Sequence, residues 1–218
     1  PGVQAHRFNV PRRPRELPGW AQEPARRPLA MLALGFTLSS IGTVKPMWMG
    51  IVVAILTVVA GAVGRAQDAR RWNRLQRGGT SPSDNSRMWA MSPWYLVRSL
   101  VSVGFAFLLA MGTALVYIMI ADSAGVMNDD SAVLGSFPIQ TRYYILCFLG
   151  LVLYLLILWL APWGAATRRG GAHILNSFAP SDSGRRNLVM GILVVGVVFF
   201  ILTFAGAMPL PDLSPFGN

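Results

Sequence analysis

One apolar stretch decides the fold. Residues 93–121 read PWYLVRSLVSVGFAFLLAMGTALVYIMIA and contain a single charged residue, Arg98. About 20 consecutive apolar residues in a helix cross the roughly 30 Å hydrocarbon layer of a bilayer. This stretch therefore predicts a transmembrane helix. Three more stretches are long and apolar enough for the same prediction, namely residues 48–64, 143–163 and 188–208.

A fifth apolar stretch, residues 29–44, is shorter and is followed directly by Lys45 and Pro46. The residue before a proline avoids the α-helical region, whereas proline itself suits the first turn of a new helix. We therefore expect residues 29–64 to form a tight helical hairpin that turns at Lys45 and Pro46. The alternative is one broken or re-entrant element.

The composition of the 218 residues agrees with a membrane protein. Apolar residues make up 53% of the chain and charged residues only 13%, and the mean hydropathy is +0.48. Since soluble domains carry about 25% charged residues, this composition excludes a disordered chain and argues against an ordinary water-soluble enzyme. The single cysteine, Cys147, excludes an internal disulfide and a multi-cysteine metal site.

The basic residues predict an orientation. Sixteen of the 19 lie before residue 29 or in the connections after the second and fourth spans, and an excess of Lys and Arg in short loops marks the cytoplasmic face. The predicted fold is therefore an all-α integral membrane protein of five transmembrane helices, with the N-terminus cytoplasmic and the C-terminus on the opposite side. We expect it in a bacterial inner (plasma) membrane, with an organellar inner membrane as the alternative. The predicted parts are a 1–28 Arg/Pro-rich cytoplasmic tail, a 29–208 membrane domain and a 209–218 Pro-rich outer tail.

Small residues recur at helical spacing within the spans and let helices approach closely in lipid. The candidate helix-packing residues are Gly104, Ala106, Ala110, Ala114, Gly191 and Gly196. Their neighbour is either a helix of the same chain or a helix of a partner. In contrast, residues 151–158 are large and apolar on all sides, which predicts that this span faces lipid or lipid-like ligands.

Arg98 is the candidate intramembrane charge. It is either an anchor whose long stem reaches back to the interface, or a residue that contacts a partner subunit or a lipid headgroup. Basic residues of the two cytoplasmic connections are candidates for contact with anionic headgroups. These candidates are Arg70, Arg71, Arg168, Arg169, Arg185 and Arg186. Binding to nucleic acid is disfavoured because membrane topology already accounts for the charge.

The two cytoplasmic connections resemble each other. Residues 77–87 contain Arg-Gly-Gly, then Pro-Ser-Asp, then Arg, and residues 169–186 repeat that order. The repetition is compatible with a duplicated two-helix unit of the kind that some transporters contain. The alternative is that both are turn-rich basic loops beside an anionic leaflet.

The chain lacks the residues that membrane chemistry needs. Its only histidines are His6 and His173, outside the predicted spans, so paired haem ligands are excluded. We expect no cofactor, no metal and no catalytic site. The predicted function is a non-catalytic accessory or structural subunit of a larger inner-membrane complex (respiratory, photosynthetic or secretory), which contributes helix packing and basic cytoplasmic contacts to other membrane subunits. The alternative is a small membrane transporter or channel.

Overall fold

The computed structural model describes residues 28–128, 134–161 and 164–211, and this part of the chain forms helices without any strand. Four of the helices are long and apolar enough to cross a membrane, which confirms four of the predicted spans. These four are α2, α4, α5 and α7. The full series is α1 (Pro28–Gly42), α2 (Pro46–Arg77), α3 (Ser83–Ala90), α4 (Ser92–Ser123), α5 (Ile139–Leu160), α6 (Ala165–Phe178) and α7 (Asp182–Phe204).

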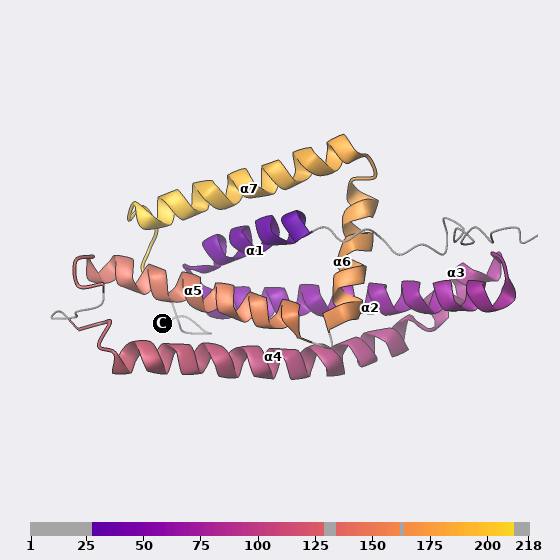
Figure 1. Cartoon of the computed structure of the whole chain (residues 1–218), viewed down its shortest axis with the longest axis horizontal. Helices are drawn as coiled ribbons and strands as arrows, with labels where there is room; N and C mark the ends of the chain where they lie inside the picture. Colours follow the sequence, from indigo (N-terminus) through magenta and orange to yellow (C-terminus); the bar gives the residue numbers. More distant parts are fainter. Residues whose placement is uncertain (1–27, 129–133, 162–163, 212–218) are drawn as a thin grey trace, which may run out of the picture.

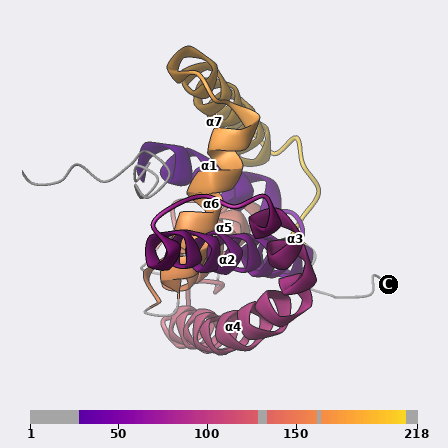
Figure 2. The ribbon, with the colours of Figure 1, turned by 90° about the vertical axis from the view of Figure 1, so that its right-hand side faces the viewer.

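The long helices lie roughly along one common axis, and α6 lies across them (Figure 1). Seen along the bundle, α7 and α1 lie on one side and α4 on the other, with α2 and α5 between them (Figure 2). Successive long helices alternate in direction, so that α1 and α7 run the same way (Figure 1). The chain therefore enters α1 at one end of the bundle and leaves α7 toward the other end.

The second helix is longer than its apolar part. It continues from the predicted span, 48–64, through Arg77, so the first part of the connection after this span is helical. Residues 65–77 are rich in Ala, Gln and Arg, which favour helix, and no proline interrupts them. Gly78 ends the helix with φ 74°, a left-handed conformation that glycine adopts without strain.

The connection between α5 and α7 is also helical over most of its length, in contrast to the turn-rich loop that is one of the two interpretations of its sequence. It forms α6, whose apolar and polar residues lie on different faces. The two similar sequences therefore take different structures. Gly78 of the first caps the end of α2, whereas Gly170 of the second lies in the middle of α6.

The first helix, α1, is too short for a full span. Its 15 residues extend about 22 Å at 1.5 Å per residue. The chain turns at residues 43–45, as expected, but α1 packs mainly on α7 and α5, so the expected tight hairpin with α2 is wrong. Gly42, at the end of α1, lies against Leu151 in the middle of α5. The turn therefore lies level with the middle of α5, and α1 stops short of the end of the bundle.

The core forms around α5. Tyr154 and Leu158 pack with Ala161, with Val53 of α2, and with Ala106 and Ala110 of α4. The expectation that residues 151–158 face lipid is therefore wrong, because Leu151, Tyr154 and Leu158 are buried. Small residues on α4 leave room for the large side chains of α5. The alanines at 106 and 110 thus contact a helix of the same chain.

Candidate functional site at the basic end of the bundle

Two glycines bring α6 into backbone contact with α2. A β-carbon on Gly64 would overlap the carbonyl oxygen of Ala166, and one on Gly170 would overlap the carbonyl oxygen of Ala60. The helices therefore cross at a separation that only glycine allows at these two positions. Sequence reasoning placed Gly170 in a loop and missed this crossing. The Arg-Gly-Gly of residues 169–171 carried no signal for it, because glycine pairs are common in turns.

Arginines of α6 fix both sides of the crossing. The guanidinium of Arg169 donates to a carboxylate oxygen of Asp68 on α2 over 3.0 and 2.7 Å. Arg168 donates to the carbonyl oxygen of Trp159 at the end of α5, over 2.5 Å. Asp68 and Arg169 are about one-third exposed, and pairs of this kind contribute about 1 kcal/mol or less. Their main effect is therefore to orient α6 on α2.

Next to the crossing, Arg65 joins α2 to α4. It donates to the hydroxyl of Ser102 over 2.6 Å, while the hydroxyl of Ser99 donates to the carbonyl of Val58 over 2.8 Å. One terminal nitrogen of Arg65 is buried without a hydrogen-bond partner among the described residues. The candidate intramembrane charge Arg98 is exposed, and its positive charge repels that of Arg65. Sequence reasoning identified Arg98 and missed Arg65.

Asp84 attaches the short helix α3 to the end of α2. Its buried carboxylate accepts hydrogen bonds from Arg74 over 2.7 Å and from Arg77 over 3.2 Å. The backbone N–H of Ser81 donates a third over 3.1 Å. The hydrogen bond from Arg74, with that from Ser81, lowers the pKa of Asp84 below its usual range. The carboxylate is therefore ionised at neutral pH.

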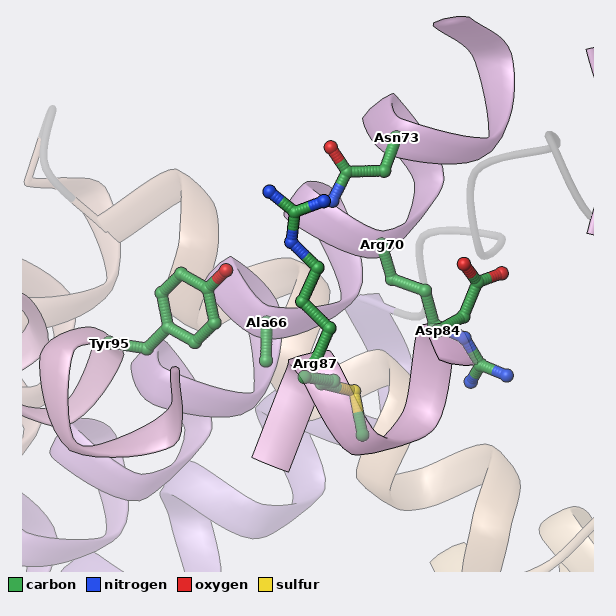
Figure 3. Close-up of a pocket in the computed structure, with 7 residues that line it drawn as sticks. Ala66, Arg70, Asn73, Asp84, Arg87 and Tyr95 are labelled. Carbon is green, nitrogen blue, oxygen red and sulfur yellow. The ribbon is translucent and has the colours of Figure 1, made fainter. Parts of the chain in front are cut away.

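A small recess lies between α2, α3 and the start of α4 (Figure 3). The Arg87 side chain runs along it toward Asn73, and the Tyr95 hydroxyl lies on the same side in this view. Arg70 extends toward the Asp84 side, and its Nε is buried without a partner in the described part of the chain. The lining residues are Ala66, Arg70, Asn73, Asp84, Arg87, Met88 and Tyr95.

The six headgroup candidates differ in their contacts within the chain. Hydrogen bonds hold three of them, namely Arg168, Arg169 and Arg185. Of these, Arg185 donates to the side-chain oxygen of Asn176 over 3.1 Å and pairs with Asp182. Arg186 is exposed and Arg70 lines the recess. Arg71 lies near His173, and its positive charge contributes to lowering the pKa of that imidazole.

His173 on α6 is the only histidine among the described residues. Burial lowers its pKa, and the carboxylate of Asp68 opposes that effect. The neutral imidazole is therefore favoured at neutral pH. No group of three or more His, Cys, Asp or Glu that could hold a metal occurs within the described ranges.

At the opposite end, a buried arginine organises the connection from α4 to α5. The guanidinium of Arg142 donates to the carbonyl oxygens of Asn128 (2.7 Å), Phe137 (2.9 Å), Gly135 (3.0 Å) and Val126 (3.3 Å). These carbonyls belong to the described residues on either side of 129–133, so one side chain joins the end of α4 to the start of α5. Sequence reasoning did not identify this role of Arg142.

The remaining helix-packing candidates differ in environment. Gly196 is buried, and a β-carbon there would lie 2.5 Å from the hydroxyl oxygen of Thr37 on α1. Ala114 is half-buried. Gly104 on α4 and Gly191 on α7 have open space where a side chain would stand, as has Gly112 on α4. The candidates Gly104 and Gly191 thus have no packing partner in the described part of the chain.

Comparison of the chain with protein-family models, with curated proteins and with solved structures gives no match.

Proposed function

We propose that this chain is a non-catalytic accessory subunit of a larger inner-membrane complex, in which it packs against other membrane subunits. The observation that carries the proposal is the outward position of Gly104, Gly112 and Gly191. Glycine inside a helix costs about 1 kcal/mol relative to alanine. Packing within the chain explains Gly64, Gly170 and Gly196, but it does not explain these three. A neighbouring helix that approaches closely would use them.

The basic end is the end of the bundle that carries the arginines of α2, α3 and α6, and its polar groups support a structural role. Asp68, Asp84 and Arg169 hold helices of the same chain together. His173 lies near Asp68 and Arg71, and burial favours its neutral form. A nucleophile with an adjacent base, the usual arrangement for covalent chemistry, is not formed by these contacts. Asp68, Asp84 and Arg169 thus serve helix contacts within the chain.

The proposed placement has the basic end in the cytoplasm of a bacterium and the C-terminus outside it, since basic residues concentrate at that end. In this placement α4, α5 and α7 cross the membrane, and α2 runs to the basic end from the turn near the middle of α5. The short helix α1 is the fifth membrane segment and ends near the middle of α5. Because α6 lies across the long helices in both views, it would lie along the cytoplasmic surface (Figure 1, Figure 2).

The test is mild-detergent solubilisation of the native membrane, followed by blue-native electrophoresis and mass spectrometry of the band that contains the chain. We expect co-migration with partner proteins in fixed stoichiometry. Migration of the chain alone, or as a small homo-oligomer, would contradict the proposal.

One observation favours the alternative function, a small transporter or channel. Ser39, Ser40 and Thr43 are buried around the break between α1 and α2, at the level of the middle of α5. The hydroxyls of Ser40 and Thr43 donate to carbonyls of α1, whereas the Ser39 hydroxyl has no partner among the described residues. Broken helices at this depth line binding sites in transporters.

Flux measurements in liposomes separate the two functions. A transporter would move an ion or solute in liposomes that contain only this chain, and Ser39→Ala would reduce the rate. The accessory-subunit proposal expects no flux above that of empty liposomes, for the wild type and for the variant alike.

A further inference from the structure

The recess between α2, α3 and α4 has an excess of positive charge. Arg70 and Arg87 line it, and Arg74 and Arg77 lie beside it at the end of α2. The single carboxylate of the recess, that of Asp84, already accepts hydrogen bonds from Arg74, Arg77 and the N–H of Ser81. Asp84 therefore neutralises neighbours of the recess and leaves Arg70 and Arg87 without an ion-pair partner in the described ranges.

The donors of the recess come from three helices. Ala66, Arg70 and Asn73 share one face of α2, because residues four and seven apart lie one above the other. The short helix α3 folds back on α2 and presents Arg87, and α4 adds the hydroxyl of Tyr95 (Figure 3). The small side chain of Ala66 leaves space between these donors. An anion on the Asn73 side of the recess would meet the guanidinium of Arg87 with the amide of Asn73 and the hydroxyl of Tyr95, while Arg70 adds positive charge from the Asp84 side (Figure 3).

The recess lies just beyond the apolar part of α2. That part ends at Gly64, and Ala66, Arg70 and Asn73 follow within about 14 Å along the helix. Three tryptophans surround the same level with exposed rings, which is typical of the membrane–water interface. These are Trp72 (63% exposed), Trp89 (72%) and Trp94 (59%). In the proposed membrane placement, this is the level of lipid phosphates.

We propose that this recess binds the phosphate of an anionic phospholipid headgroup. Arg87 and Arg70 supply the positive charge, and Asn73 and Tyr95 donate hydrogen bonds to phosphate oxygens. Hydrogen bonds between a guanidinium and phosphate are charge-assisted and stronger than neutral ones. The proposal rests on the membrane placement given above. Of the six headgroup candidates it retains Arg70, and it adds three residues outside that set, Asn73, Arg87 and Tyr95.

The test uses the purified full chain in a maltoside detergent. Its unfolding temperature is measured during titration with phosphatidylglycerol, with phosphatidylcholine and with inorganic phosphate. We expect stabilisation by phosphatidylglycerol and none by the other two at equal concentration. Stabilisation by inorganic phosphate at the same concentration would overturn the assignment to a lipid and indicate a soluble anion.

Two matched variants test the place of binding. Arg87→Gln removes a charge from the recess at an exposed position, and Arg186→Gln removes one from an exposed position at the start of α7. We expect phosphatidylglycerol to bind Arg87→Gln about tenfold more weakly, the effect of one lost charge-assisted hydrogen bond, and to bind Arg186→Gln as it binds the wild type.

Equal binding by Arg87→Gln and the wild type would overturn the proposal, and so would equal weakening in both variants, which indicates general attraction by charge. Tyr95→Phe keeps the ring and removes one hydrogen-bond donor, so it is a second test of phosphatidylglycerol binding at the recess with little effect on folding. Because these measurements use the chain alone, their failure is separate from a failure to find partner subunits.

Discussion

Two sets of helix glycines differ in what surrounds them. Gly64 and Gly170 lie where α2 and α6 cross, and each faces backbone of the other helix. Gly104 and Gly191 lie on α4 and α7 with open space beside them. In sequence the two sets look alike, since all four follow or precede apolar or small residues. The comparison teaches that a glycine within a membrane helix indicates close approach, but does not indicate whether the neighbour belongs to the same chain.

The crossing gives the largest expected effect. Gly170→Ala places a methyl group against the carbonyl of Ala60 and the backbone nitrogen of Gly64, neither of which can move without shifting α2. We expect a loss of about 2–3 kcal/mol of stability from overpacking. Thermal unfolding of the purified chain in detergent measures it, and hydrogen exchange over 165–178 would rise. An unchanged unfolding temperature would show that the helices do not cross at backbone contact.

Gly196 gives an intermediate case. A methyl group there meets the hydroxyl of Thr37 at 2.5 Å and a ring carbon of Phe36 at 3.0 Å. Part of this contact is with side chains that can rotate, so Gly196→Ala should cost less, about 1–2 kcal/mol. It should also weaken the hydrogen bond from Thr37 to the carbonyl of Ile192, which is 2.8 Å long. Hydrogen exchange in α1 is the measurement, and protection equal to that of the wild type would refute the expected α1–α7 contact.

The outward glycines give the smallest effect, with the opposite sign. Gly104→Ala and Gly191→Ala add a methyl group into open space and remove the cost of glycine in a helix. For the isolated chain we expect a gain of about 0.5–1 kcal/mol from each. Thermal unfolding again measures it. Destabilisation of the isolated chain would mean that these positions are packed within the chain, and the comparison would fail.

Much of the fold could be predicted from the sequence because lipid imposes a simple requirement. Long apolar stretches had to form helices, so α2, α4, α5 and α7 follow from hydropathy alone. The helical state of residues 65–77 and 165–178 could not be predicted in this way. Their residues mix polar and apolar side chains, and α6 contacts α2 through Gly170, whose partners lie about 100 residues away in sequence.

The candidate site was predictable in charge but not in pairing. Clusters of arginine indicated the basic end, yet the pattern did not distinguish Arg169, which pairs with Asp68, from Arg186, which is exposed. The same limit applies to Arg142, whose four carbonyl partners come from a connection without a recognisable motif. Large residues at 151–158 indicated lipid, because the sequence does not show that α4 offers Ala106 and Ala110 to receive them.

The most direct test of the proposed subunit function uses Gly191→Leu with Gly191→Ala as its control. Both substitutions fill open space, so the isolated chain should fold in each case. In native membranes we expect the leucine variant to be absent from the large complex and to migrate alone on blue-native gels, whereas the alanine variant remains partly assembled. Wild-type levels of assembly for the leucine variant would contradict the claim that this outward face contacts a partner subunit.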